Sequence, residues 1–537
     1  MKSHAELTDF KETSRYEDVI RFFADLEKQS PLVHSETFGH SHEARALPLI
    51  IISDPPISQP SEAISSGKAV VFVMANIHAG EVEGKEAVQS LARRLVGGDL
   101  RPVLKNLVLL IAPIYNADGN EKINPRNRPD QYGPLGGVGV RENGQGLDLN
   151  RDYMKLEAPE SRALMALFNK WDPHLTVDLH TTDGSYHAYH LTYSPTLNPM
   201  ADARLIAYER EQMLPRIQSE MLDKHHYRTY YYGNFSTREA LDNELDRFTE
   251  PKPGQIAPTK VWRTFDHRPR FGNNYVGLRN RMTILSEAYS HLDFRRRVEV
   301  TEAFVEEILK YAGEHATEIR SLTKQVDADL VANSAVASTF GVQFEMAPLP
   351  APVKLLVGDV TRIKHPVTGL EMIAMVEDKV TPVEMPDFGV FKATREVTAA
   401  SYYLFPNDSV FARCVETLKA HGIAVEELVS PLKAEVQMFL IEKVAKAGRA
   451  FAGHNSIKLS GHSARETVSI PAGSLLVRRA QPLGRLASYL LEPESDDGLV
   501  YWNFLDAQLL VGTSYPILKV MENLPLKTRP YVLRADR

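Results

Sequence analysis

Two histidines and two glutamates stand directly after apolar segments of the chain, where they could act together on a metal ion. His78 and Glu81 follow the run AVVFVMANI, His180 follows HLTVDL, and Glu287 follows MTIL and one serine. Two imidazoles and one carboxylate are a donor set of catalytic zinc, which keeps a fourth position for water and lowers the pKa of that water to about 7. A further carboxylate such as Glu287 could then accept the proton of the water.

The spacing His-x-x-Glu is by itself a weak indication of a metal site, because it occurs three times in the chain. The copy at His40 lies in a polar stretch before the apolar segments of the expected sheet, and the copy at His315 lies on a charged helical stretch. Only the copy at His78 follows a long apolar run and has two glycines, Gly80 and Gly84, that allow the backbone to turn tightly. The place of His78 in the chain therefore favours a site there.

The segments around these residues predict strands and helices in alternation. Residues 69–77 form an almost unbroken apolar run rich in β-branched side chains, which is typical of a strand buried on both faces. Apolar residues recur at helical spacing over 88–95, and the runs at 107–114, 174–179 and 282–285 predict further strands. The alternation predicts an α/β fold with a mixed, mostly parallel sheet and helices on both faces. Ligands of such sheets bind at the carboxyl ends of the strands, where the candidate residues lie.

The length of 537 residues predicts two or three domains. A long amphipathic helix is expected over about 294–330, and the small residues and prolines of 326–352 indicate a boundary. We therefore expect a catalytic domain over residues 1–335 and an accessory domain over 345–537. The second part carries short alternating segments and a strand–helix–strand inset at 400–428, which predict an α+β or mostly β fold.

Composition excludes several classes of protein. Charged residues make up 24% and hydrophobic residues 43%, and the net charge of −7 offers no basic surface for nucleic acid. No apolar run approaches the ~18 residues of a membrane span. The single cysteine, Cys414, rules out an intrachain disulfide and a thiolate metal cluster. The first residues lack the apolar core of a signal peptide, so we expect a cytoplasmic protein, or a periplasmic or secreted one if such a peptide precedes this numbering.

The candidate residues belong to a longer series of motifs. In chain order these are His78-x-x-Glu81, Asp148-x-Asn150-Arg151, His180 after a short strand and Glu287 after a late strand. In order and approximate spacing the series resembles the zinc carboxypeptidases of the carboxypeptidase A type, over residues 69 to 290. The resemblance implies their α/β fold, one zinc ion per chain held by His78, Glu81 and His180, and hydrolysis of C-terminal peptide bonds.

The resemblance also implies roles for residues around the metal. Glu287 would be the general base that later protonates the leaving amine. Asp148 would accept a hydrogen bond from His78 and fix the orientation of its ring. Asn150 and Arg151 would bind the terminal carboxylate of the substrate, the contact that makes an exopeptidase. The expected partners are therefore peptides with a free C-terminal carboxylate.

Two further roles implied by the resemblance fall in loops. Arg128, in NPRNRPDQ, best matches the arginine that stabilises the oxyanion of the tetrahedral intermediate, with Arg126 as the alternative. Tyr275, in FGNNYVGLRNR, is the candidate for the tyrosine that covers the bound substrate, although it lies closer to Glu287 than the family pattern would place it. The motif set does not extend past about residue 335.

Two other functions fit the same residues. The first is a zinc amidohydrolase of the aspartoacylase or succinylglutamate desuccinylase type, which resembles this chain in its metal ligands but acts on small acylated amino acids. The second is a catalytically inactive zinc-binding module. Asn150 and Arg151 favour a peptidase over the first, and Glu287 speaks against the second because a binding module needs no base. Structural explanations also exist, since His180 could be a buried core histidine and Arg128 a surface charge.

Overall fold

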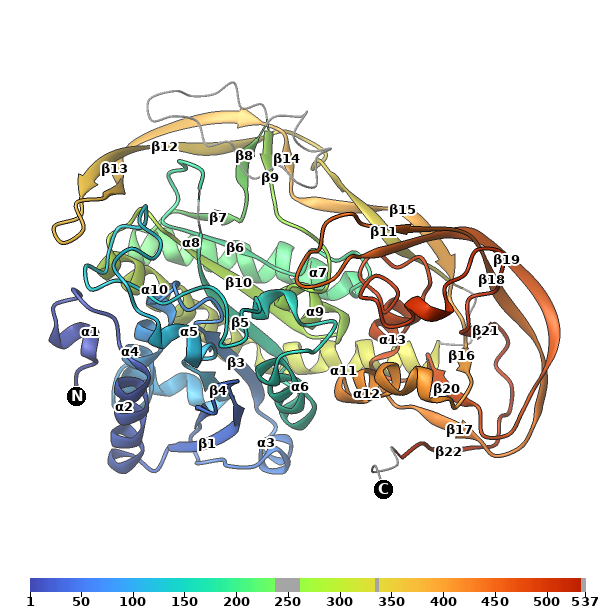
Figure 1. The fold of residues 1–537 in the computed structure, drawn as a ribbon. Coiled ribbons are helices and arrows are strands. Elements are labelled where there is room, and N and C mark those ends of the chain that lie inside the picture. Colours follow the sequence, from blue (N-terminus) through green and yellow to red (C-terminus); the bar gives the residue numbers. More distant parts are fainter. Residues whose placement is uncertain (183, 237–260, 334–337, 533–537) are drawn as a thin grey trace.

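A mixed eight-stranded sheet lies at the centre of the computed structural model, which describes residues 1–182, 184–236, 261–333 and 338–532 (Figure 1). From one edge to the other its strands are β1 (Val33–His40), β2 (Ala46–Ile52), β4 (Leu107–Ala112), β3 (Ala69–Ala75), β5 (Leu175–Thr182), β10 (Met282–Tyr289), β6 (Leu191–Ser194) and β7 (Thr229–Tyr231). The four strands β4, β3, β5 and β10 run parallel, and β2 and β6 pair with this group in the antiparallel sense. The sheet confirms the predicted fold class.

Helices cover both faces of the sheet, as the alternating pattern predicts. One face packs against α2 (Tyr16–Gln29), α4 (Glu83–Gly97), α8 (Leu214–His225) and α10 (Phe294–Glu314). The other face packs against α6 (Pro159–Trp171) and α9 (Gly272–Leu278). In β3, Val71 points into the first layer and Phe72 into the second, so every residue of the strand is buried. Burial on both faces explains the unbroken apolar run in the sequence of β3.

Further elements lie in the described part of residues 1–333, which we call the sheet region. They are α1 (His4–Leu7), α3 (Pro60–Ser66), α5 (Ala117–Glu121), α7 (Ala203–Tyr208), β8 (Asn234–Ser236), β9 (Val261–Arg263) and α11 (Ala316–Ala332). The expectation of one helix over 294–330 is wrong, because the backbone leaves helical angles at His315 (φ −106°, ψ 16°) and divides it into α10 and α11. None of the described helices is long and apolar enough to cross a lipid bilayer.

Residues 338–532, which we call the C-terminal region, are rich in strands. A seven-stranded sheet has the order β19 (Ile457–Ile470), β18 (Leu432–Lys446), β21 (Leu518–Val520), β16 (Tyr402–Phe405), β20 (Leu475–Arg478), β17 (Glu426–Leu428) and β22 (Thr528–Pro530). Two helices, α12 (Ala412–Ala420) and α13 (Gly484–Leu491), accompany it. The predicted inset is present as β16, α12 and β17, and the mostly β character is confirmed. The expected boundary near residue 335 falls in 334–337, outside the described residues, so the two domain ranges stay a prediction.

Long strand pairs distinguish the C-terminal region from the short strands that its sequence predicts. Two pairs lie outside the seven-stranded sheet: β11 (Thr339–Ala347) with β15 (Val390–Thr398), and β12 (Val353–Lys364) with β13 (Glu371–Met385). A short strand, β14 (Asp387–Phe388), pairs with β9 of the sheet region. The β12–β13 pair extends away from the rest of the C-terminal region and passes across the sheet region (Figure 1).

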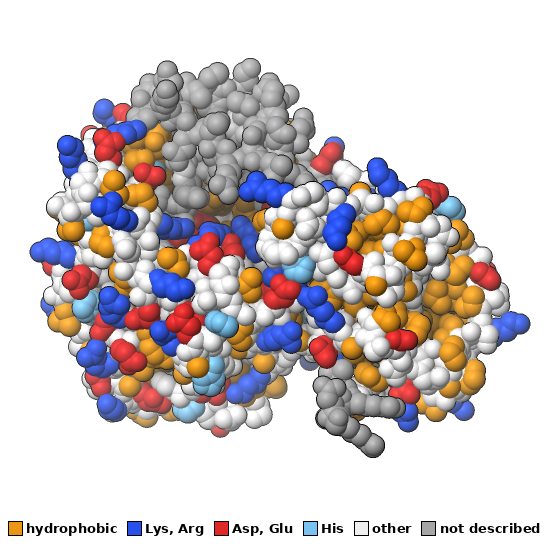
Figure 2. Space-filling view, viewed as in Figure 1, with side chains coloured by type: hydrophobic (Ala, Val, Ile, Leu, Met, Phe, Trp, Pro, Cys, Tyr) orange, Lys and Arg blue, Asp and Glu red, His pale blue; other side chains and the backbone are white. Residues whose placement is uncertain are grey.

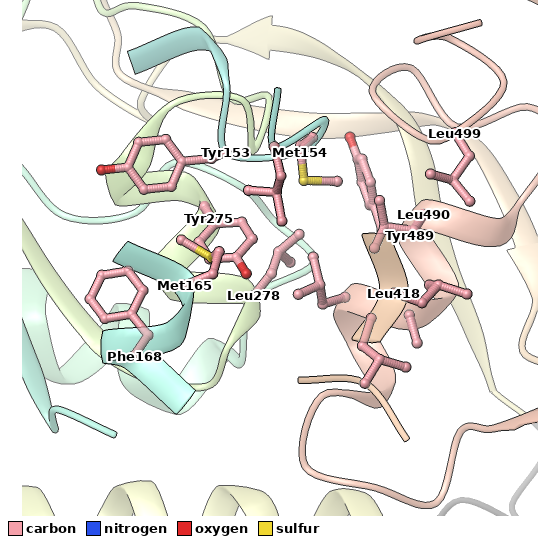
Figure 3. Packing of buried hydrophobic residues seen from close by; sticks show 14 of the residues in the cluster. Tyr153, Met154, Met165, Phe168, Tyr275, Leu278, Leu418, Tyr489, Leu490 and Leu499 are labelled. Atoms are coloured by element: carbon pink, nitrogen blue, oxygen red, sulfur yellow. The ribbon is translucent and has the colours of Figure 1, made fainter. Parts of the chain in front are cut away.

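One hydrophobic core is shared between the two regions. Figure 3 shows the side chains that meet there, with Tyr153, Met154, Met165, Phe168, Tyr275 and Leu278 of the sheet region facing Leu418, Tyr489, Leu490 and Leu499 of the C-terminal region. All of these side chains are buried. The α6 and α9 face of the sheet is therefore covered by the C-terminal region rather than by solvent.

Candidate metal centre

The three residues predicted as metal ligands lie together at the carboxyl edge of the sheet. His78 Nδ1 is 3.1 Å from Glu81 Oε1, and His180 Nδ1 is 2.9 Å from Glu81 Oε2. One donor atom from each residue lies within 4.8 Å of the others. Each residue is only 3% exposed. In the space-filling view, acidic and basic side chains intermingle at the middle of the molecular face shown (Figure 2).

The local backbone explains why these side chains meet. Beyond β3 the chain passes through Asn76, which adopts the left-handed conformation (φ 68°) that asparagine tolerates. A turn follows, in which the Glu81 N–H donates to the His78 carbonyl oxygen at 2.9 Å. His180 lies within β5, which pairs in parallel with β3. Neighbouring parallel strands thus deliver the ligands to one point of the sheet edge.

Each imidazole places its second nitrogen next to a carboxylate. His78 Nε2 lies 3.1 Å from Asp148 Oδ1. His180 Nε2 lies 2.9 Å from Asp178 Oδ2, although the contact is off the direction of a good hydrogen bond. Asp178 is 2% exposed. A carboxylate behind a ligand histidine fixes the tautomer and makes the ring a better donor to a metal.

The electrostatics of the group suit a cation. Burial alone would raise the pKa of Glu81, but the charges of His78 and Arg128 hold it well below the usual range. Burial likewise opposes protonation of His180, yet Asp178 and Glu81 raise its pKa well above the ordinary value. The Glu81 carboxylate therefore stays ionised and attracts positive charge. A metal ion would satisfy the same carboxylate and displace the proton from His180.

Glu287 lies in β10, the strand next to β5 in the sheet. Its Cα is the registered partner of His180 across the parallel ladder and of Thr192 across the antiparallel one. Registered partners point to the same face of a sheet, and neighbouring strands lie about 4.8 Å apart. Glu287 is half-buried. The structure therefore places the predicted base beside the third candidate ligand and on its side of the sheet.

Two arginines approach the ligand group from the long loop between α5 and α6. Arg128 Nη2 lies 2.5 Å from Glu81 Oε1, whereas its alternative, Arg126, is exposed. Arg141 Nε donates to Asp148 Oδ2 at 2.8 Å, and Arg141 Nη1 lies 3.9 Å from Glu81 Oε1. Gly80 permits the approach of Arg128, because a Cβ at residue 80 would lie 2.9 Å from Arg128 Cδ. Both arginines thus bring positive charge next to Glu81.

Asn150 and Arg151 stand on a short 3-10 turn that begins beside Asp148. The Asn150 N–H donates to Asp148 Oδ1 at 2.9 Å, and Asn150 Oδ1 accepts from the Gly272 N–H at 2.9 Å. The second bond orients the amide so that its NH₂ end points away from Gly272. The Arg151 guanidinium stacks 3.8 Å from the centre of the Phe271 ring. Burial lowers the pKa of Arg151 to about 10, so the side chain stays cationic at neutral pH and is better stabilised with an anion beside it.

Tyr275 is not brought to the ligand group. Its side chain is fully buried in the core shared by the two regions, and its hydroxyl bonds to His421 Nδ1 at 2.8 Å. A tyrosine held in this way packs α9 against the C-terminal region. The placement explains why Tyr275 lies closer to Glu287 in the sequence than the family pattern requires of a tyrosine that covers substrate.

The residues present fit a zinc ion. Two Nδ1 atoms and one carboxylate converge within a few ångströms, and each ring has a carboxylate at its far nitrogen. Nitrogen and oxygen donors of this kind form the three-residue sets of catalytic zinc sites. Another group, His225 with Glu306 and Glu307, has a similar donor spacing but lies against Lys310 and Arg94, whose charges already satisfy the carboxylates.

Sequence reasoning missed two of these residues. Arg141 stands in the same loop as Arg128, and only its distance to Glu81 and Asp148 distinguishes it from other loop arginines. Asp178 precedes His180 by two residues in a strand, and this spacing places both side chains on one face. The pattern Asp-x-His at a strand end could therefore have identified Asp178 as a neighbour of His180.

Comparisons with known proteins find similarity to carboxypeptidases. The family model of zinc carboxypeptidases matches residues 19–254. Carboxypeptidase 2 of Trichophyton tonsurans is 22% identical over 503 residues, which cover 89% of this chain and 81% of the relative. Carboxypeptidase 2 of Trichophyton rubrum is 21% identical over 91% of this chain and 83% of the relative. A metallo-carboxypeptidase structure from Burkholderia cenocepacia is similar with a TM-score of 0.40 and 17% identity, over 57% of this chain and 70% of that one.

The family match includes the positions of the three candidate ligands and of Asn150 and Arg151. The relatives extend the similarity into the C-terminal region, since they align over about nine-tenths of the chain. Residues 19–254 of the chain therefore match the zinc carboxypeptidase family, and this match together with the similar carboxypeptidases supports a zinc-dependent metallopeptidase.

Proposed function

We propose that the protein is a zinc carboxypeptidase that hydrolyses the C-terminal peptide bond of peptides, with His78, Glu81 and His180 holding the metal. The observation that carries the proposal is the position of Asp148. Its Oδ1 is in contact with His78 Nε2 and also accepts the N–H of Asn150. One carboxylate thus connects a metal ligand to the turn that presents Arg151. The site for a terminal carboxylate and the site for the metal are held at a fixed separation.

Substrate binding and chemistry follow from the residues around the ligands. Arg151 and the NH₂ end of Asn150 bind the terminal carboxylate by charge-assisted hydrogen bonds. When bound, zinc polarises the scissile carbonyl and makes a water molecule acidic enough to attack at neutral pH. Glu287 accepts a proton from the water and passes it to the nitrogen of the leaving amino acid as the carbon–nitrogen bond breaks.

The positive charge of Arg128 stabilises the oxyanion that forms on the attacked carbonyl. Arg141 can share this task, because both guanidinium groups approach Glu81. Arg141 also contacts Asp148, so its removal disturbs the support of His78 as well. Its loss should therefore change zinc affinity, whereas loss of Arg128 should act mainly on the rate.

The test is release of free C-terminal amino acids from a mixed peptide library by the zinc-loaded protein. We expect stepwise release that a chelator abolishes and that Glu287→Gln lowers by about 10² to 10⁴-fold. Amidated peptides should resist, because they offer Arg151 no carboxylate. No release, together with hydrolysis of N-acyl amino acids, would replace the peptidase by the amidohydrolase function. Zinc binding without either activity would support a binding module.

Arg126 provides a matched control for Arg128, since the two lie in one loop and only Arg128 contacts Glu81. We expect Arg128→Ala to lower kcat by about 10² to 10³-fold and Arg126→Ala to leave it unchanged. Equal rates in the two variants would remove Arg128 from the mechanism and leave Arg141 as the source of positive charge.

A further inference from the structure

The β12–β13 hairpin, with its connection at 365–370, forms an arm that leaves the C-terminal region and lies across the sheet region (Figure 1). Its strands are twelve and fifteen residues long. Many of its residues are exposed or half-buried. Such a hairpin does not acquire a fixed position from a core of its own, so its position depends on what it contacts.

One strand of the arm contacts the segment that follows the third candidate ligand. The Ala188 N–H donates to the Leu356 carbonyl at 2.9 Å, and the Gly358 N–H donates to the Tyr186 carbonyl at 2.8 Å. The backbones approach so closely that a Cβ on Gly358 would lie 2.6 Å from the carbonyl oxygen of His187. Strand β12 is thus fastened to the chain that leaves β5, the strand of His180.

The other strand contacts the two remaining segments of the site. The Ile373 N–H donates to the carbonyl of Asp130 at 3.0 Å, two residues beyond Arg128. The Met375 N–H donates to the carbonyl of His291 at 2.7 Å, four residues beyond Glu287. These two N–H groups point out of the hairpin, because their partners lie in the sheet region. Strand β13 therefore docks on the Arg128 loop and on the end of β10.

Side chains add a third point of attachment. Glu377 Oε2 lies 3.1 Å from His190 Nε2 and 3.1 Å from Arg296 Nη2. The Glu377 carbonyl also accepts from Arg228 Nη2 at 3.0 Å. His190 directly precedes β6, so these bonds tie the arm to a further strand beside Glu287. The arm contacts chain on both sides of the candidate site.

The Arg128 loop needs support of this kind. Arg128 adopts a left-handed backbone conformation (φ 49°), which is unfavourable for a residue with a Cβ and persists only when its surroundings fix it. At the tip of the arm, His365 is buried and accepts the N–H groups of Val367 and Thr368 at Nδ1. This leaves the proton on Nε2. The ring lines a cavity of about 10 Å³ together with Arg128 and Gln131.

We infer that the arm is a positioning element of the active site, which holds Arg128 and the segments after β5 and β10 in their working geometry. The inference rests on the proposed function, because it concerns the rate of that reaction. It assigns a role to the C-terminal region, which supplies none of the proposed metal ligands or catalytic residues. A displacement of about 1 Å at a catalytic group is enough to lower a rate by about a hundredfold.

The test removes one docking bond without disturbing the hairpin ladder. Ile373→Pro deletes the N–H that reaches Asp130, and proline is tolerated where a strand N–H points away from its ladder. We expect kcat to fall by about tenfold to a hundredfold, with a smaller change in KM and no change in zinc content. Backbone hydrogen exchange should accelerate in residues 124–138. Ile373→Val keeps the N–H and should behave as the unaltered protein does.

Two further variants keep the inference falsifiable. Replacing residues 365–370 by Asn-Gly preserves a tight hairpin turn while it removes His365 from the Arg128 cavity, and should act in the same direction. Asp359→Ala alters an exposed pair with Lys379 on the same arm and should change nothing. Wild-type kcat and exchange in both the proline and the turn variants would overturn the inference. An unaltered protein that releases no amino acids would refute the proposed function, while the exchange measurement would still decide the role of the arm.

Discussion

At the scale of single residues, the candidate site is built from two similar units. Each unit is an imidazole with Nδ1 toward Glu81 and Nε2 toward a buried or half-buried carboxylate, which is Asp148 for His78 and Asp178 for His180. With zinc bound, such a carboxylate would hold the proton of the far nitrogen, so that Nδ1 would present a lone pair to the metal. Zinc binding would still displace a proton from His180, because Asp178 and Glu81 raise the pKa of that ring in the absence of a metal.

The first prediction concerns Asp178. The change Asp178→Asn keeps the shape of the side chain and removes its charge, so His180 loses the negative charge beside its Nε2. We expect zinc affinity to fall by about 10 to 100-fold, measured by competition with a chromophoric chelator. Asp99→Asn, at an exposed position, serves as the control. Unchanged affinity in Asp178→Asn would show that His180 needs no support from this carboxylate.

Residue types and the positions of strand ends predict part of this site. His78, Glu81, His180 and Glu287 could be named because each follows an apolar strand, and strand ends of one sheet meet. Arg141 could not be assigned, because its contacts depend on the path of a long loop. No periodic pattern in the sequence predicts that path. Tyr275 was assigned from a family pattern, and the structure places it in the shared core, which local sequence does not reveal.

At the scale of elements, the helix after the first ligands must lie very close to the sheet. A Cβ on Gly84, in the first turn of α4, would lie 2.7 Å from the Cβ of Leu179 in β5 and 3.3 Å from the Cβ of Ala75 in β3. Leu179 directly precedes His180. The absence of a side chain at residue 84 therefore allows α4, which begins two residues after Glu81, to lie close to the strand that carries His180.

The second prediction is that Gly84→Ala separates α4 from β5. Because both neighbours belong to a packed core, we expect the free energy of unfolding to fall by about 1–3 kcal/mol and zinc affinity to fall with it. Gly97→Ala is the matched control at the other end of α4, where an added Cβ would meet nothing within 4 Å. That variant should be neutral or slightly more stable. Urea unfolding with and without zinc measures both effects, and a stable Gly84→Ala protein with full zinc affinity would contradict the prediction.

Some elements can be predicted from their local sequence and others cannot. Strands buried on both faces, such as β3 and β4, are apolar runs that periodicity identifies directly. The long strands β12, β13 and β19 are mostly half-buried or exposed, so their sequences resemble polar loops with short apolar segments. These strands are long because they pair across a hairpin and because β13 also contacts the sheet region. Neither interaction can be predicted from the local sequence.

At the scale of the whole molecule, buried histidines make the contact between the two regions sensitive to acid. His421 of the C-terminal region is fully buried against α9 and accepts the hydroxyl of Tyr275 at Nδ1. Burial lowers the pKa of His421 to about 3. In the unfolded chain the pKa of a histidine is about 6.5. Between these values the unfolded state binds a proton that the folded state excludes, so stability falls as the pH falls.

The third prediction follows from this difference. The contribution of His421 to acid sensitivity is absent above about pH 6.5 and grows by about 1.4 kcal/mol for each pH unit below it. We expect His421→Gln to lose about 2 kcal/mol less stability than the unaltered protein between pH 7 and pH 5. Urea unfolding at the two pH values is the measurement. His42→Gln, at an exposed position, should keep the full loss, and equal losses in all three proteins would refute the prediction.

The core shared by the two regions also bears on how the protein is made. The face of the sheet that carries α6 and α9 is complete before Tyr489 and Leu499, which cover it, have been synthesised. Translation proceeds at ~5–20 residues per second. The roughly 200 residues that follow α11 therefore emerge over about 10 to 40 s. During that interval an apolar surface of the nascent chain is exposed to solvent. We therefore expect molecular chaperones to bind this protein at the ribosome and to release it only after the last strands have formed.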